Sequence, residues 1–235
     1  MELLTTYFCK NKKRMGENGD GGYIYAELPV YDCYISAGIG NDDSCSKDFI
    51  DKYNMSKEDC FAFDGTIDNY PTKGSDKINF IKKNIDGFND NYHTDLSFLA
   101  DKYNDIFMKM DVEGGEFKWL SSISLERLSK FKQMTIEFHG MNDHGYGSDI
   151  QTKILCFEKL THTHYLIHAH GNNCAGTRGP FPNVLELTYV NKKCYRSPPE
   201  LNTVPLPIPN LDYPNNSDTP DINLNFFPFT SKKIN

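Results

Sequence analysis

Short apolar runs alternate along the chain with segments of helical periodicity, which is the pattern of an α/β sheet with crossover helices. The apolar runs are rich in β-branched and aromatic residues and end at glycine or polar positions, as core strands do. The last two runs are close enough in sequence to pair with each other. Strands are predicted over residues 31–36, 60–63, 77–85, 106–110, 134–138, 165–170 and 184–190.

A helix is predicted after residue 148. There, Ser148 and Gln151 form a plausible capping box for a helix whose predicted inner face is Ile150, Ile154 and Phe157. Shorter helices are predicted over 46–53, after caps at Thr94 and Ser124, and around Phe117 and Leu120.

The composition changes after Ser197, because eight of the twelve prolines lie in the remainder of the chain. Proline disrupts helices and central strands, so we predict a domain over 1–196 and an extended proline-rich arm over 197–235. Phe226, Phe227 and Phe229 favour an arm that packs on the same domain, since exposed phenylalanines are unfavourable in water.

Charge and cysteine content narrow the class of protein. The 235 residues carry a net charge of −7 and lack an extended basic region, which argues against a nucleic-acid partner. Seven cysteines without a CxxC pair fit reduced thiols in the cytoplasm better than a disulfide framework or a zinc site. No signal segment or membrane-spanning run is evident, so no membrane partner is expected.

A glycine turn follows the first predicted strand. Gly38 and Gly40 let the chain pass close to a ligand, and Asn41 follows them. A dinucleotide fingerprint would place a third glycine at Asp43, where an acid would repel a pyrophosphate. The turn therefore favours S-adenosylmethionine, which has a sulfonium cation and no phosphate, over NAD. A plain tight turn is the alternative.

Asp64 ends the second predicted strand, where nucleotide-binding sheets place an acid for the ribose hydroxyls. A turn or capping role is the alternative. The turn-rich motif Asp20-Gly21-Gly22-Tyr23 precedes the first core strand, and we interpret it as a flap over the cofactor or else as a hairpin turn.

Proton-transfer groups lie two residues apart at three predicted strand ends. Such pairs share one face of an extended strand, and the set is a candidate catalytic centre. The carboxylates and imidazoles could also hold Mg²⁺ or Mn²⁺, although no ligand spacing specifies a metal. The pairs are Asp111 with Glu113, Glu137 with His139, and His168 with His170.

These motifs together resemble the FkbM-type branch of the class I S-adenosylmethionine-dependent methyltransferases, over residues 14–190. The resemblance rests on the segments at 20–23, 36–40, 62–64, 109–116 and 136–139, with Asp-Val-Glu-Gly the most specific. It implies a Rossmann-like, mostly parallel sheet of seven strands in the order 3-2-1-4-5-7-6, with helices on both faces. It also implies O-methylation of sugars or other small metabolites. The sequence also resembles glycan-methylating domains of large DNA viruses, which act on deoxysugars such as rhamnose. If the protein is viral, it is expected to act in the host cytoplasm.

The resemblance implies in-line displacement of the methyl group from the sulfonium. The expected base is His139, with Asp111, Glu113 and Glu137 orienting it or the substrate, and His170 is the alternate base. Ser36 stands where the family has an acid, so part of the donor's amino-group contact must come from elsewhere. The donor-binding residues expected are Asp20, Gly21, Gly22, Tyr23, Ser36, Gly38, Gly40, Asn41, Asp64 and Asp111.

Two rival functions use the same residues. A metal-dependent hydrolase would act without a methyl donor and lose activity on chelation. A non-catalytic binding module would hold a partner through the arm and show no donor affinity.

Overall fold

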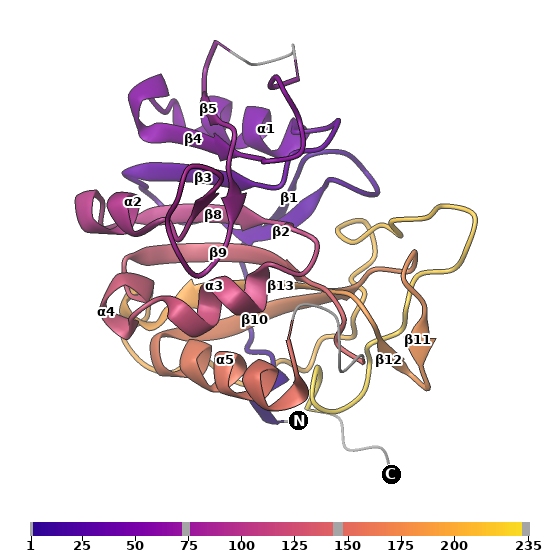
Figure 1. The fold of residues 1–235 in the computed structure, drawn as a ribbon. Helices are drawn as coiled ribbons and strands as arrows, with labels where there is room; N and C mark the ends of the chain where they lie inside the picture. Colours follow the sequence, from indigo (N-terminus) through magenta and orange to yellow (C-terminus); the bar gives the residue numbers. More distant parts are fainter. Residues whose placement is uncertain (1, 72–75, 143–147, 232–235) are drawn as a thin grey trace.

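The computed structural model describes residues 2–71, 76–142 and 148–231 (Figure 1). Its centre is a seven-stranded sheet in the order β10-β13-β9-β8-β3-β4-β5, in which only β13 runs antiparallel to its neighbours. Numbered along the chain, these strands follow the order 3-2-1-4-5-7-6 that the resemblance implies. They are β3 (Cys33–Ala37), β4 (Cys60–Phe63), β5 (Asn79–Ile81), β8 (Ile106–Met110), β9 (Phe131–Phe138), β10 (His164–Gly171) and β13 (Leu185–Asn191).

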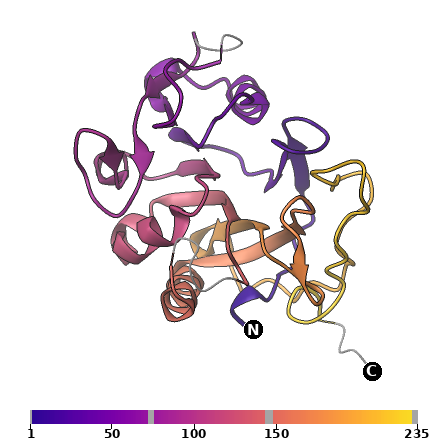
Figure 2. The same ribbon diagram turned by 45° about the vertical axis from the view of Figure 1, so that its right-hand side comes forward.

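Helices cover both faces of this sheet. The side chains of β3 alternate: Cys33, Ile35 and Ala37 pack in one core with α2–α5, whereas Tyr34 packs in a second core with Phe49 of α1. Figures 1 and 2 show α1 and the other helices on opposite sides. The helices are α1 (Ser44–Tyr53), α2 (Ser97–Lys102), α3 (Glu116–Ser122), α4 (Leu125–Leu128) and α5 (Ile150–Thr163), with 3₁₀ turns at Glu2–Leu4, Lys57–Asp59 and Lys192–Cys194.

The predicted capping of α5 is wrong. Asp149, not Ser148, caps the helix, and its Oδ1 accepts a hydrogen bond from the Thr152 amide at 2.9 Å. The helix buries Lys153, Cys156, Phe157 and Leu160, so the predicted inner face is confirmed at Phe157 and wrong at Ile150 and Ile154, which are 37% and 38% exposed. The Lys153 ammonium is accommodated because it donates to the Gly140 carbonyl at 2.7 Å.

The predicted strand over 77–85 is two elements. β5 ends at Ile81, where the Lys83 amide donates to the Ile81 carbonyl at 2.8 Å and turns the chain. The next strand then leaves the sheet and pairs with β7. The turn-rich motif at 20–23 ends the turn of an antiparallel hairpin of β1 (Lys12–Met15) and β2 (Tyr23–Ala26), as its hairpin alternative predicted. Among the described residues, the small sheets of β6 (Asn84–Ile85) with β7 (His93–Thr94) and of β11 (Thr177–Arg178) with β12 (Phe181–Pro182) were not predicted.

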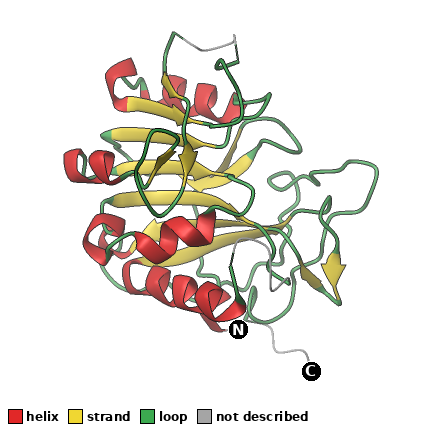
Figure 3. Cartoon of the chain, viewed as in Figure 1, coloured by secondary structure: helices red, strands yellow, loops and turns green. Residues whose placement is uncertain are grey.

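The segment 197–231 has no helix or strand and runs over the surface as loop (Figure 3). Leu206, Leu224 and Phe229 are nonetheless buried in the larger core. Phe226 packs against that core, but Phe227 is 44% exposed, so docking of all three phenylalanines is not observed. Within the described residues, none of the helices has the length and apolar composition that a bilayer crossing needs.

Candidate functional site

A cavity of about 760 Å³ opens at the carboxyl ends of β3, β4 and β8, where an open parallel sheet places its ligands. Most of the predicted donor-binding residues line it. Those that do are Asp20, Gly21, Tyr23, Gly38, Gly40, Asn41, Asp64 and Asp111, and Glu113 joins them.

The glycine turn forms one wall of the cavity. Gly38 has φ +76°, and a Cβ there would lie 1.5 Å from the Asp111 carbonyl oxygen. This close approach is maintained because the Asp111 amide donates to the Ala37 carbonyl at 2.8 Å. Gly40 has φ +54°, but a Cβ there would meet nothing within 4 Å. Gly38 is therefore required for packing, whereas Gly40 leaves room for a ligand.

Asp64 holds this turn in place. Its Oδ2 accepts from the amides of Ile39 and Gly40 at 3.0 Å each, and its Oδ1 accepts from the amide and hydroxyl of Thr66 at 2.7 and 2.6 Å. Burial acts to raise the pKa of Asp64, but these hydrogen bonds outweigh it and lower the pKa to about 2. Since a carboxylate has about four lone-pair sites, Asp64 is saturated by protein donors, which supports the turn-stabilising alternative.

The charge of the cavity favours a cationic ligand. Six acids line it, namely Asp20, Asp42, Asp64, Asp86, Asp111 and Glu113, against three lysines at 83, 109 and 118. The prediction that Asp43 would face the ligand is wrong, because its carboxylate accepts hydrogen bonds from Ser36 and Tyr70 and does not line the cavity. Its neighbour Asp42 lines the turn instead.

Lys109 is a site residue that was not predicted. Its side chain is buried in β8, where its Nζ donates to the Gly38 carbonyl at 2.5 Å and lies 3.9 Å from Asp111 Oδ2. Burial acts to lower the pKa of Lys109, but the nearby carboxylates, Asp111 first, raise it. A lysine inside an otherwise apolar strand was the signal that could have identified it.

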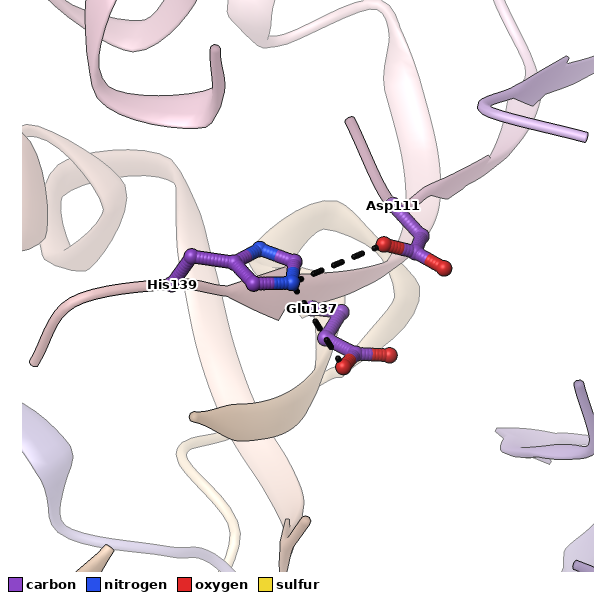
Figure 4. Close-up of side chains that lie close together, drawn as sticks. All are labelled: Asp111, Glu137 and His139. Atoms are coloured by element: carbon purple, nitrogen blue, oxygen red, sulfur yellow. Dashed lines mark ion pairs between the residues drawn. The ribbon is translucent and has the colours of Figure 1, made fainter. Parts of the chain in front are cut away.

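Behind the cavity wall, Asp111, Glu137 and His139 converge from the ends of β8 and β9 (Figure 4). His139 Nε2 lies 3.8 Å from Asp111 Oδ1, 3.7 Å from Glu137 Oε1 and 3.4 Å from Glu113 Oε2. Glu137 and His139 are buried and do not line the cavity, whereas Asp111 belongs to both.

The other ring nitrogen of His139 contacts Glu116, a buried acid that was not predicted. Nδ1 lies 2.9 Å from Glu116 Oε1, which also accepts from the amides of Val112 and Gly114. Burial acts to lower the pKa of His139, but the surrounding carboxylates, Glu116 foremost, raise it to about 9. An imidazole that holds its proton at neutral pH is a poor base, so these contacts count against the predicted role of His139.

Two neutral side chains orient the carboxylates. The Tyr23 hydroxyl lies 3.2 Å from Asp111 Oδ2 and 3.3 Å from Glu137 Oε2, and Asn172 Nδ2 donates to Glu137 Oε1 at 2.9 Å. Burial, Asp111 and Glu186 raise the pKa of Glu137 well above its ordinary value.

His170, the alternate base, is engaged on both ring nitrogens. Nδ1 lies 3.0 Å from Glu186 and Nε2 lies 3.0 Å from Asp221 of the C-terminal segment. Burial acts to lower the pKa of His170, but these carboxylates raise it well above its ordinary value. His170 does not line the cavity, and its contacts connect β10 to the segment 197–231.

Two predicted donor-binding residues lie outside the cavity lining. Gly22 is buried in the turn between β1 and β2, where a Cβ would lie 1.9 Å from the Glu17 carbonyl oxygen. Ser36 is buried in β3 and donates to Asp43. Both residues therefore support the walls of the cavity.

Comparisons with protein-family models, with curated proteins and with solved structures found no match to this chain. The function of the chain is therefore inferred from the geometry of the cavity and from the motifs around it.

Proposed function

We propose that this chain is an S-adenosylmethionine-dependent O-methyltransferase that acts on a hydroxyl of a sugar, with deoxysugars of the rhamnose type in glycans as the acceptor class. The observation that carries the proposal is the cavity at the carboxyl ends of β3, β4 and β8, with its glycine turn and its excess of acids. The strand order and the Asp-Val-Glu-Gly motif support the same assignment.

The residues of the cavity fit this donor. Its volume lies within the usual range of about 300–1,000 Å³ for small-molecule sites. Gly40 leaves open space at the turn, and the acidic lining complements a ligand with a sulfonium and an ammonium group. A dinucleotide would place its pyrophosphate beside Asp42 and Asp64, which disfavours NAD.

When bound, S-adenosylmethionine supplies a methyl group on a positively charged sulfur. Within the catalytic set we assign proton removal to Glu113. This side chain lines the cavity, is 75% exposed, and projects from a residue with φ +52°. A positive φ at a residue other than glycine is unfavourable and is often found at functional sites. Glu113 takes the hydroxyl proton while the oxygen–carbon bond forms and the carbon–sulfur bond breaks, leaving a methyl ether and S-adenosylhomocysteine.

Alignment of the reacting atoms should supply most of the acceleration, since well-oriented partners gain about 7–11 kcal/mol. Proton removal adds about a hundred- to ten-thousand-fold. The cavity walls held by Asp64 and Lys109 provide that alignment on the donor side.

Calorimetric titration with S-adenosylmethionine, with NAD as the control, tests the proposal. Micromolar binding of the first ligand alone is expected, followed by methyl transfer to deoxysugar acceptors. Absence of donor binding would refute the proposal. Hydrolysis without a donor would instead support the hydrolase.

A further inference from the structure

The cluster of Asp111, Glu137 and His139 has the dimensions of a cation site. One possible ligand atom from each residue lies within 4.8 Å of those of the other two (Figure 4). The two distances from His139 Nε2 are 3.8 and 3.7 Å. Two atoms that bind one cation at about 2.1 Å are separated by at most about 4.2 Å, so small side-chain shifts bring all three into coordination.

The imidazole is oriented as in metal centres, where a ligating histidine donates its second ring N–H to a carboxylate. Glu116 occupies that position, with Oε1 2.9 Å from His139 Nδ1. Glu116 is itself positioned by the amides of Val112 and Gly114. Glu116 retains the proton on Nδ1, so a cation that displaces the proton from Nε2 would bind the nitrogen that faces Asp111 and Glu137.

Two buried carboxylate oxygens at this place accept no hydrogen bond from the described residues. One is Asp111 Oδ1, which is itself a member of the cluster. The other is Oε2 of Glu116, a side chain with 0% exposure behind His139. Buried anionic oxygens without donors are unfavourable unless a positive charge is nearby. The nearest cationic groups are the Lys109 ammonium, 3.9 Å from Asp111 Oδ2, and the His139 imidazole, whose Nε2 is 3.8 Å from Asp111 Oδ1, but neither donates a hydrogen bond to Oδ1.

We propose that Asp111, Glu137 and His139 bind one divalent cation of the Mn²⁺ type. Carboxylates suit Mg²⁺ and Mn²⁺, whereas the imidazole nitrogen favours a transition metal, so Mn²⁺ should bind more tightly than Mg²⁺. Because Asp111 also lines the cavity, the cation lies at the cavity wall, where it would coordinate the acceptor hydroxyl and lower the pKa of that hydroxyl. This last step depends on the proposed methyltransferase function, whereas the cation site does not.

The test is a titration of the metal-free protein with Mn²⁺ alone. Binding is measured by electron paramagnetic resonance, as the decrease in the signal of free Mn²⁺. One site per chain is expected. Glu137→Gln and His139→Gln should each weaken binding more than a hundredfold. Glu116 is not a proposed ligand but orients His139, so Glu116→Gln should weaken Mn²⁺ binding about 10–100-fold. Glu158→Gln, an exposed acid on α5, is the matched control and should bind as the wild type does.

Absence of Mn²⁺ uptake by the folded wild-type protein up to millimolar concentration would overturn the inference. Unchanged uptake by both ligand variants would also overturn it, and circular dichroism identifies any variant that does not fold. The wild-type titration decides the question even where a variant fails. Calorimetry with S-adenosylmethionine on the same preparations separates the two proposals. Donor binding without Mn²⁺ uptake refutes the cation site alone, and uptake without donor binding refutes the methyltransferase alone.

Discussion

Replacement of Asp64 by asparagine tests how the wall of the cavity is held. Asp64 is 8% exposed, and its carboxylate accepts hydrogen bonds from Ile39, Gly40 and Thr66. Its pKa falls from 3.8 to about 2 in the folded protein. At 1.36 kcal/mol per pKa unit, the ionised carboxylate stabilises the fold by about 2 kcal/mol. An asparagine side chain keeps one acceptor oxygen but points its NH₂ group at backbone or hydroxyl donors. Asp64→Asn should therefore lower the free energy of unfolding by about 2 kcal/mol.

The pH dependence follows from the sign of the shift. Because the folded protein holds the proton less tightly than the unfolded chain, the stabilisation is complete above the unfolded pKa and is lost as pH falls toward 2. Urea unfolding of wild type and Asp64→Asn should differ by about 2 kcal/mol at pH 7 and 5, and by about half as much at pH 3. Asp218→Asn, at an exposed position, should show no such change. A difference that is absent at pH 7, or equal at every pH, would refute the reasoning.

Three further predictions concern the turn, the base and the C-terminal segment. Gly40 and Gly176 both have positive φ and open surroundings, so replacement of either by alanine should lower the free energy of unfolding in urea by about 1–2 kcal/mol. Only Gly40→Ala should also weaken donor binding in calorimetry. Equal affinities would contradict the donor site. Glu113→Gln should bind the donor normally and lose about a hundred- to ten-thousand-fold in turnover, and unchanged turnover would eliminate it as the base. Phe229→Ala should lower the free energy of unfolding by about 3–5 kcal/mol, because Phe229 is buried. Phe227 is exposed, so Phe227→Ala should change it by under about 1 kcal/mol. Similar losses for the two variants would disprove the burial of Phe229.

Most of the sheet was predictable because its strands are short apolar runs that end at glycine or polar residues. The mixed run 77–85 has no such break at the turn after β5, so its two elements were predicted as one strand. The carboxyl-end position of Gly38, Asp64 and Asp111 followed from the same rule, since parallel strands bring their ends to one edge. The capping of α5 was less predictable, because Ser148 and Asp149 are adjacent and both are good caps. The inner face was less predictable for a separate reason, because Ile150 and Ile154 are apolar yet partly exposed, whereas Lys153 is buried by its hydrogen bond to the Gly140 carbonyl.

Roles inside the site depended on contacts that the sequence does not contain. The buried position of Glu116 beside His139 arises where the start of α3 meets the end of β9, and these residues are 23 positions apart. The same contact raises the pKa of the histidine that looked like a base. His170 likewise contacts Asp221, which is 51 positions away in a segment without regular structure, and this contact occupies the nitrogen that a base would use. Spacing along one strand predicts which side chains share a face, but not which partners approach that face.

The contacts of β10 have a consequence for how the chain folds. The Tyr7 amide donates to the Leu166 carbonyl at 2.7 Å, and the Thr6 hydroxyl donates to the Phe229 carbonyl, a separation of 223 residues. Asp212 and Asp221 of the C-terminal segment hydrogen-bond His168 and His170 of the same strand. Pairings between such distant segments give high contact order, which slows folding because long loops must close first. This edge of the sheet should therefore form late, after the β3–β4–β8 centre, and should exchange its amide hydrogens sooner than that centre does.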